Sequence, residues 1–506
     1  MADPSLPNRA KKRWNSLKIE SQNLEGSQLT AILLVVSIGN LMGAIDGNIV
    51  SIALPKMALD LGSGISLLSW VVTAYLIASG ASVLQAGKLG DLYGRKKIFL
   101  AGLALFGLSS ALVGLSSNIY EVIGFRILQG VSGTFSVATG YPLIFDSFPP
   151  KRVAAAIGIT SAAWSAGAVA GPVVGGFLVA IGWRFIFFIN VPIALVAVLI
   201  GVRSIPSIRG LRVNDESQSN FRMVLNDLNP ASSLILAFSI TSALLWLTFF
   251  NDLFAFFAIV GTIAFYIAER KSANPLLNRE LLRSKGFVYA LIGGSTITPI
   301  AIGGVIYGMS FYFQTVTNAT PEFSGILIAP LPVALMIASV ASGRIYSRFS
   351  VPVLISVLGL ALMISGLIFL YIVILGTSFP LWSISVLLGV IGTGGGLWYT
   401  PMTTTILKFA RLQLTGVANG TASMLFSIGI AAGIALTTLV SASFLAPKIV
   451  AQIFLGNLAT LTRSEATAFG DGIGLAMLFS ALVIIVALPF YVIVAKEQSR
   501  LLQSSQ

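Results

Sequence analysis

The sequence contains no cysteine and no histidine, and only 10% of its 506 residues are charged. The lack of cysteine excludes disulfides, thiolate metal sites and a thiol nucleophile. The lack of histidine removes the side chain that most often changes charge near neutral pH, so proton chemistry would have to use carboxylates. A soluble domain carries roughly 25% charged residues. A chain this poor in charge cannot cover its surface with charged groups, which argues against a water-soluble protein.

Long apolar runs fill the sequence instead. Hydrophobic residues make up 56% of the chain, and its 50 glycines suit the close helix packing of membrane proteins. A membrane-spanning helix needs about 20 mostly apolar residues. We predict an all-α membrane protein with fourteen such helices, over residues 30–54, 65–86, 98–116, 119–144, 153–180, 184–203, 231–250, 252–268, 287–313, 323–342, 351–375, 380–407, 415–444 and 472–495.

The positive charges indicate the orientation of these spans. With a cytoplasmic N-terminus, the predicted cytoplasmic segments hold 26 of the 31 Lys and Arg residues. The predicted external loops hold four, and Arg126 lies within a span. Because Lys and Arg concentrate on the cytoplasmic side, we expect both termini there, with residues 445–471 as the longest external loop. The net charge of +13 is then explained by anionic lipid, without a nucleic acid partner.

Two polar stretches, 204–230 and 269–286, divide the chain. The predicted plan is a cytoplasmic tail over 1–29 with no cleaved signal peptide, a six-helix bundle over 30–203, linkers over 204–286 with an inserted hairpin at about 231–268, a second six-helix bundle over 287–496, and a cytoplasmic tail over 497–506. Short basic turns that begin with glycine follow the second span of each bundle, at Gly87–Arg95 and Gly343–Arg348. Such repeated halves are typical of transporters.

The first of these turns reads GKLGDLYGRKK over Gly87–Lys97. It is similar to the G-x-L-x-D-x-x-G-R-K signature of the major facilitator superfamily. The resemblance implies two six-helix bundles and a turn that gates the transport path through Gly87, Asp91, Gly94 and Arg95. Arg95 is expected to reach Asp146, which ends the fourth span on the same side.

The fifth span contains Gly167, Gly171, Pro172, Gly175 and Gly176 in the pattern G-x-x-x-G-P-x-x-G-G. Glycines four residues apart let helices approach closely, and proline bends a helix. The pattern resembles the motif that related families reserve largely for antiporters. Spans one and four, with the segments IDGNIVSIALP from Ile45 and RILQGVSG from Arg126, resemble the fourteen-span drug:proton antiporters of that superfamily.

Asp46 and Arg126 are the charged residues that lie clearly inside the predicted spans. Ionisable groups at this depth are costly and usually functional. At 1.5 Å per residue, Asp46 lies about 6 Å from the outer edge of the apolar core and Arg126 about 10 Å from it. We therefore predict a proton-coupling pair. A pair that only fixes helix packing remains an alternative.

The favoured function is proton-coupled antiport, by alternating access, of amphipathic or cationic drugs. The alternative is an exporter or flippase of an endogenous lipid or amphipath with weak or no proton coupling, since the spans of the second bundle lack a central acid. Aromatic and polar side chains suit amphipathic ligands, so the predicted substrate-lining residues are Asn48, Gln129, Tyr307, Tyr312, Gln314, Trp398, Tyr399, Asn419 and Ser423.

The sequence shows no constellation of an enzyme, because it has neither a nucleophile paired with a base nor a phosphate-binding loop. We expect no cofactor and no metal, with the proton as the coupling ion. We also expect a monomer in the plasma membrane, surrounded by lipid, with a small amphipathic molecule as its substrate.

Overall fold

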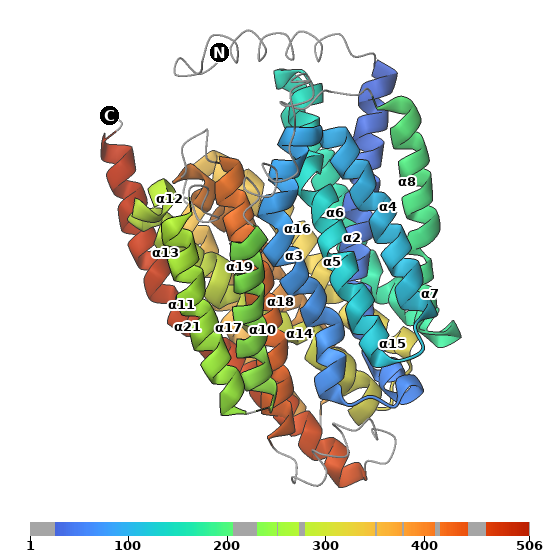
Figure 1. Ribbon diagram of the computed structural model, residues 1–506. Coiled ribbons are helices and arrows are strands. Elements are labelled where there is room, and N and C mark those ends of the chain that lie inside the picture. Colours follow the sequence, from blue (N-terminus) through green and yellow to red (C-terminus); the bar gives the residue numbers. More distant parts are fainter. Residues whose placement is uncertain are drawn as a thin grey trace, which may run out of the picture.

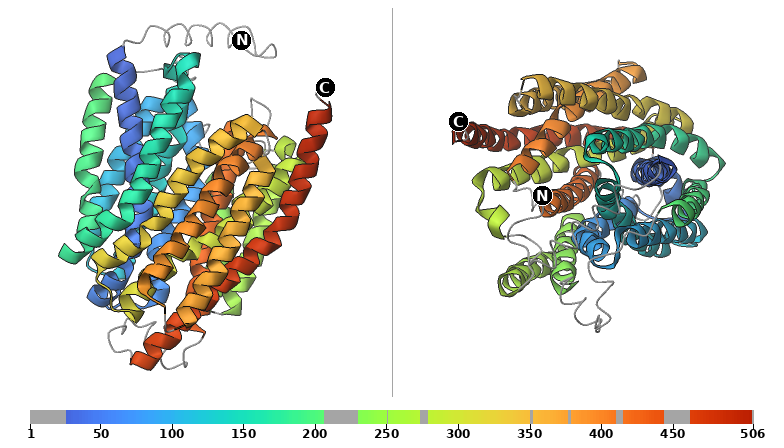
Figure 2. Two further views of the ribbon diagram at one scale, coloured as in Figure 1. Left: turned by 180° about the vertical axis from the view of Figure 1, so that it is seen from behind. Right: turned by 90° about the horizontal axis from the view of Figure 1, so that it is seen from above.

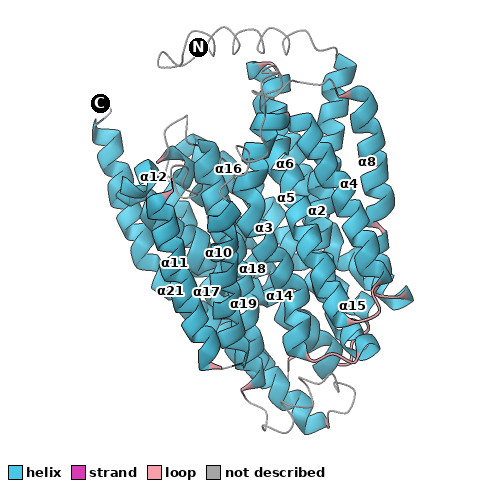
Figure 3. Ribbon diagram, viewed as in Figure 1, coloured by secondary structure: helices cyan, strands magenta, loops and turns pink. Residues whose placement is uncertain are grey.

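The computed structural model describes residues 26–205, 230–249, 251–272, 279–349, 352–376, 379–409, 415–443 and 462–504. Within these ranges all regular structure is helical (Figure 3). Eleven of the described helices are long and apolar enough to cross a membrane. The predicted all-helical membrane class is therefore confirmed.

The first group of helices comprises α2 (Gly26–Leu61), α3 (Ile65–Tyr93), α4 (Arg95–Leu115), α5 (Ile119–Ser147), α6 (Pro150–Ile181), α7 (Phe185–Phe188) and α8 (Asn190–Ser204). Within this group α2 packs on α6, and α5 packs on both α3 and α4. Local sequence sets the boundaries. Asn118 caps α5 by accepting the amide hydrogen of Glu121 at 3.0 Å, and Glu121 accepts the Ser117 amide at 2.8 Å in return.

A hairpin of α10 (Pro230–Phe249) and α11 (Asp252–Lys271) follows. The second group comprises α12 (Arg279–Arg283), α13 (Lys285–Ala290), the π-helix η1 (Leu291–Ile297), α14 (Thr298–Phe311), the π-helix η2 (Tyr312–Val316), α15 (Pro321–Ile328), α16 (Pro330–Phe349), α17 (Pro352–Leu375), α18 (Leu381–Lys408), α19 (Thr415–Ala442) and α21 (Arg463–Ser504). Here α18 packs on α16 and α17, and α19 packs on α14.

Three predicted spans are not single regular helices. Residues 184–203 are divided between α7, which ends at Phe188, and α8, which begins at Asn190. Residues 287–313 were expected to form one helix, but this stretch passes through α13, η1 and α14 into the start of η2, with Pro299 in the first turn of α14. Residues 323–342 were also expected to be continuous, but α15 ends at Ile328 and α16 begins at Pro330. Proline has no amide hydrogen to donate to the preceding turn, which accounts for the break between α15 and α16 at Pro330. Pro299 leaves the turn at the end of η1 short of a donor in the same way.

The predicted external loop at 445–471 is also shorter than expected. Helix α21 begins at Arg463, nine residues before the predicted start of that span. Thr462 and Glu465 cap it, because the Thr462 amide donates to Glu465 Oε2 at 2.7 Å. Residues 444–461 lie outside the described residues.

The two groups stand side by side and diverge toward the end of the molecule at which α2 begins (Figures 1 and 2). We call this the upper end and the opposite one the lower end. One apolar cluster, around Ile32, Phe99 and Leu143, belongs to the first group alone. The largest cluster joins both groups, and its members on α2 run from Ile45 to Ala58, the part nearer the lower end. The apolar core is therefore continuous between the groups toward the lower end.

The hairpin lies beside both groups, as the view from above shows (Figure 2). Leu244 of α10 is buried in a cluster with Trp70 and Ala74 of α3 and with Ala431 and Ala435 of α19. Helix α10 thus covers the line along which α3 and α19 meet.

Backbone contacts close the lower end. A methyl group added at Gly325 of α15 would lie 2.2 Å from the Pro172 carbonyl oxygen of α6. One added at Gly176 of α6 would lie 2.7 Å from both Pro321 O and Glu322 Cα of α15. Real side chains do not approach so closely, so glycine is required at both positions for α6 and α15 to touch.

We predict that Gly325→Ala destabilises the protein, because the new methyl group meets backbone atoms that cannot rotate away. Overpacking of this kind costs about 1–3 kcal/mol. The matched control is Gly124→Ala on α5, where a methyl group meets nothing within 4 Å and alanine favours the helix. Thermal unfolding in detergent should give a lower midpoint for Gly325→Ala than for Gly124→Ala. Equal midpoints would contradict the prediction.

Candidate functional site

A buried ion pair lies at the centre of the first group. Asp46 of α2 is fully buried and Arg126 of α5 is 1% exposed. The Arg126 guanidinium donates to Asp46 Oδ2 at 2.7 Å. The structure thus brings together the two residues that we predicted as a pair. A charge in an apolar interior costs several kcal/mol unless it is paired and fully hydrogen-bonded, so the surrounding donors decide whether this pair is tolerated.

Neutral side chains complete the bonding of the carboxylate. Gln129 donates to Asp46 Oδ1 at 3.0 Å, and Asn190 of α8 donates to the same oxygen at 3.2 Å. Both amides also donate to Ser110 Oγ of α4, at 3.2 and 3.1 Å. Ser110 in turn donates to the Phe187 carbonyl at 2.9 Å. Asp46 therefore accepts three hydrogen bonds, all from groups that face the interior of the bundle.

The guanidinium is fixed equally well. Its Nε donates to the Val71 carbonyl of α3 at 3.0 Å, and its Nη1 also donates to Gln129 Oε1 at 2.7 Å. The guanidinium carbon lies 4.2 Å from the centre of the Tyr75 ring, a cation–π distance. Asp46, Arg126, Gln129, Asn190 and Ser110 form one network, which we call the ion-pair network. It joins α2, α4, α5 and α8, and Tyr75 extends it to α3.

Sequence reasoning missed three of these residues. Asn190 stands in the segment WRFIFFINVP from Trp183, and its position after an aromatic run was the available signal. Ser110 and Tyr75 carry no signal of their own, since serine and tyrosine are common in membrane helices. Gln129 was expected to line the substrate path, whereas the structure buries it completely against the ion pair.

The gating motif is mostly helical rather than a loop. Helix α3 continues through Gly87 and Asp91 to Tyr93, and only Gly94 forms the turn, with φ of 98°. No proline interrupts α3 before this point. The turn falls at Gly94 because glycine, which has no Cβ, tolerates a positive φ that strains other residues. Arg95 donates to the Pro142 carbonyl of α5 at 3.0 Å. The side chains of Asp91 and Asp146 lie outside the described ones, so the contact between Arg95 and Asp146 stays a prediction.

The glycines of the antiporter motif bring α6 onto α2. A methyl group at Gly167 would lie 2.4 Å from Leu41 O. At Gly171 it would lie 2.9 Å from Asn48 Cβ, and at Gly175 it would lie 2.6 Å from Ile49 Cγ1. This face of α6 therefore packs on the turns of α2 on either side of Asp46. The remaining motif residues, Pro172 and Gly176, contact α15 as described above. The motif thus joins the helix of the ion pair to the second group.

The predicted substrate-lining residues are scattered. Tyr307, Tyr312 and Trp398 are buried, and Trp398 Nε1 donates to Tyr491 Oη at 2.5 Å. Tyr399 is 42% exposed and packs on Phe426, with 5.7 Å between ring centres.

Among the remaining predicted lining residues, Asn48, Gln314 and Ser423 are half-buried. The Asn48 amide donates to Ala44 O of its own helix at 2.8 Å, and Gln314 bonds to α2. Ser423 lies on α19, and the side chain of Asn419 lies outside the described ones.

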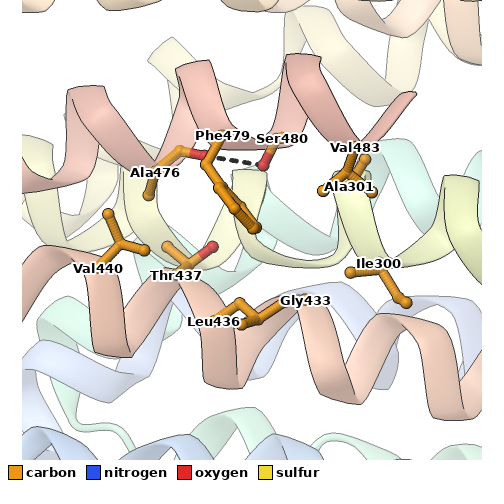
Figure 4. Close-up of a pocket in the computed structure, with 10 residues that line it drawn as sticks. All are labelled: Ile300, Ala301, Gly433, Leu436, Thr437, Val440, Ala476, Phe479, Ser480 and Val483. Atoms are coloured by element: carbon orange, nitrogen blue, oxygen red, sulfur yellow. Dashed lines mark hydrogen bonds between the residues drawn. The ribbon is translucent and has the colours of Figure 1, made fainter. Parts of the chain in front are cut away.

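A small recess lies elsewhere, between α14, α19 and α21 (Figure 4). Thr437 and Ser480 are its polar residues, and Ser480 donates to Ala476 O at 2.9 Å. The other lining residues are apolar or glycine, and none is charged. This recess lies in the second group and shares no residue with the ion-pair network, so it does not qualify as the site.

Comparison with known proteins agrees with this arrangement. The family model of the Major Facilitator Superfamily matches residues 36–434. The tetracenomycin C resistance and export protein of Streptomyces glaucescens is 30% identical over 87% of this chain and 81% of its own. The multidrug transporter protein MdtP of Bacillus subtilis is 31% identical over 80% of this chain and 74% of its own. A riboflavin transporter, RibZ of Clostridioides difficile, is 29% identical over 80% of this chain and 86% of its own.

Solved structures give the same fold at lower identity. A bacterial homologue of the human lysosomal transporter Spinster, in an inward-facing and unoccupied conformation, aligns with a TM-score of 0.67 and 15% identity. The alignment covers 94% of this chain and 98% of that one. With its helical membrane fold, its family match over most of its length and its likeness to export proteins, the chain belongs to the major facilitator superfamily.

Proposed function

We propose that this protein is a fourteen-span antiporter that exports amphipathic, often cationic compounds in exchange for protons, by alternating access. The ion-pair network is the observation that carries the proposal, because it places a titratable carboxylate and a fixed cation in the interior of the transporter fold. The relatives support the export of drug-like compounds, since one is named a tetracenomycin C resistance and export protein and another a multidrug transporter protein.

The span count rests on the helices themselves. Beyond the eleven apolar helices, α3 and α10 contain the shorter apolar stretches Leu67–Val83 and Ala231–Trp246. Helix α5 has 29 residues, enough to cross a bilayer, and carries Arg126 within it. The eleven already count α7 with α8, α13 through η2, and α15 with α16 as one span each. Adding α3, α5 and α10 brings the total to fourteen. In the predicted orientation the upper end is cytoplasmic, and the protein resides in the plasma membrane.

Protonation of Asp46 would couple the two halves of the exchange. A neutral carboxyl loses its ionic attraction to Arg126, so the network rearranges. The added proton needs an acceptor, and Asn190 Oδ1 is buried with no hydrogen-bond partner among the described residues. A half-turn of that amide would offer this oxygen to the new hydroxyl. Proton binding also raises the local charge by one, which disfavours a cationic substrate nearby. Proton and substrate then exclude each other, as exchange requires.

Orientation can be tested with single cysteines, because the chain has none of its own. Ser117 is exposed at the lower end and Ser499 at the upper end. With an impermeant maleimide on intact cells, Ser117→Cys should be labelled, while Ser499→Cys should be labelled only after the membrane is opened. The reverse pattern would overturn the orientation. Labelling of both in intact cells would contradict an arrangement in which the two ends lie on opposite sides.

Coupling can be tested by Asp46→Asn, which removes the titrating proton and nearly preserves the shape. In liposomes with an imposed pH gradient, the wild type should concentrate ethidium, and the variant should fall to the background of empty liposomes. Downhill exchange of ethidium should persist in the variant. The control is Asp60→Asn on the same helix, an exposed acid that pairs with Lys56 at 3.7 Å, and it should transport like the wild type.

Proton release can be tested with the wild type and Asp46→Asn. Ethidium added to purified wild type in weak buffer should acidify the medium, and Asp46→Asn should abolish this signal. If Asp46→Asn still concentrates ethidium on a proton gradient alone, Asp46 is not the coupling residue. If the wild type moves a fluorescent phospholipid between leaflets without any pH gradient and ignores ethidium, the protein is a flippase of amphipaths instead.

A further inference from the structure

Helix α2 carries a proline whose place in the structure the transport site does not explain. Pro55 lies inside α2, nine residues beyond Asp46. In an α-helix the carbonyl of each residue accepts the amide hydrogen four residues later. Proline has no amide hydrogen, so the Ser51 carbonyl has no such donor within its own helix. A buried carbonyl without a partner is destabilising, and Ser51 is only 6% exposed.

The missing donor comes from the other group of helices. Ser310 of α14 is fully buried and its Oγ donates to Ser51 O at 2.7 Å. Gln314 of η2, one turn further along, donates to the Ile52 carbonyl at 3.0 Å and to Ser310 Oγ at 3.2 Å. Both hydrogens of the Gln314 amide nitrogen are therefore used, and Ser310 acts as donor and acceptor at once.

This arrangement lies where the two groups meet. The second group supplies both side chains and α2 supplies both carbonyls. The π-helix η2, which begins at Tyr312, contains Gln314, and π-turns often occur at functional positions. The backbone contacts of Gly176 and Gly325 close the same lower end. Ser51 is also only five residues from Asp46 on one continuous helix.

We propose that Ser310, Gln314 and the two α2 carbonyls form a polar latch that holds the lower end closed, with Pro55 leaving one carbonyl free to be latched. Opening of the lower end separates α14 and η2 from α2 and breaks the two hydrogen bonds to the Ser51 and Ile52 carbonyls. The latch therefore favours the state open toward the upper end, and its strength sets the balance between the two states. This rests on the proposed alternating access, and it assigns to Gln314 a gating role in place of substrate lining.

The latch can be measured as a shift between conformational states. Cysteines at Tyr120 of α5 and Phe323 of α15, which are 70% and 47% exposed, would carry spin labels on opposite groups near the lower end. Double electron–electron resonance of the purified protein then reports the lower-end distance. Polar contacts between membrane helices average about 0.6 kcal/mol, so Ser310→Ala should raise the ratio of open to closed lower ends about threefold. Gln314→Ala should act in the same direction.

Two controls separate the latch from general loosening. Ser480→Ala removes a buried hydroxyl of the second group that bonds only within α21, and it should leave the distances unchanged. Pro55→Ala restores an amide hydrogen for the Ser51 carbonyl, so Ser310→Ala should have a smaller effect in that background than in the wild type. The interaction between positions 55 and 310 is specific to the latch and is not expected from lost packing.

Unchanged distances in both Ser310→Ala and Gln314→Ala would overturn the latch, as would an equal effect of Ser310→Ala with and without Pro55. The distance measurement requires no proton gradient. If Asp46→Asn retains coupled transport while the latch variants shift the populations, proton coupling through Asp46 fails and the latch stands. If Asp46→Asn uncouples transport while the latch variants do nothing, the latch alone fails.

Discussion

The burial of one carboxylate and one guanidinium is the constraint on which the arrangement of the first group depends. Each ion would cost several kcal/mol if left without partners in an apolar interior. Asp46 of α2 and Arg126 of α5 meet this demand with donors and acceptors from α3, α5 and α8, and Ser110 of α4 holds the two amides in place. Every one of these helices must present a particular face inward, so the network fixes their rotation as well as their spacing. Apolar packing alone would leave that rotation poorly determined, because lipid and protein interior are equally apolar.

The positions of the helices could be predicted from the sequence, because membrane length and apolar composition are properties of each segment taken alone. The pairing of Asp46 with Arg126 could be predicted too, since both depths follow from counting residues along a helix. The interruptions at Pro299 and Pro330 were visible in the sequence, but they were outweighed by the apolar runs around them. For the gating motif the sequence suggested too little helix. Its glycines pointed to a loop, whereas α3 continues to Tyr93 and only Gly94 forms a turn.

Partners across helices could not be predicted, because they depend on how the helices are rotated and where they touch. Gln314 illustrates this, since glutamine in a membrane helix is equally suited to a substrate and to a carbonyl group. Its partner at Ile52 precedes it by 262 residues. Asn190 is similar, since only the fold brings α8 to α2. The sequence identified Asp46, Arg126 and Gln314 as polar residues within membrane helices, while their contacts depend on the three-dimensional arrangement.

The hairpin of α10 and α11 has a consequence for molecules dissolved in the bilayer. Leu244 sits against small and aromatic residues of α3 and α19 together, where the two groups would otherwise expose their junction to acyl chains. A lipid or an amphipath that diffuses within the membrane plane to this side meets the outer surface of the hairpin before it meets the junction. The apolar side chains of α11, such as Phe256, Ile259 and Ile263, form part of that surface. Lateral exchange with the lipid phase is thus unequal around the circumference of the protein, and this flank is the shielded one.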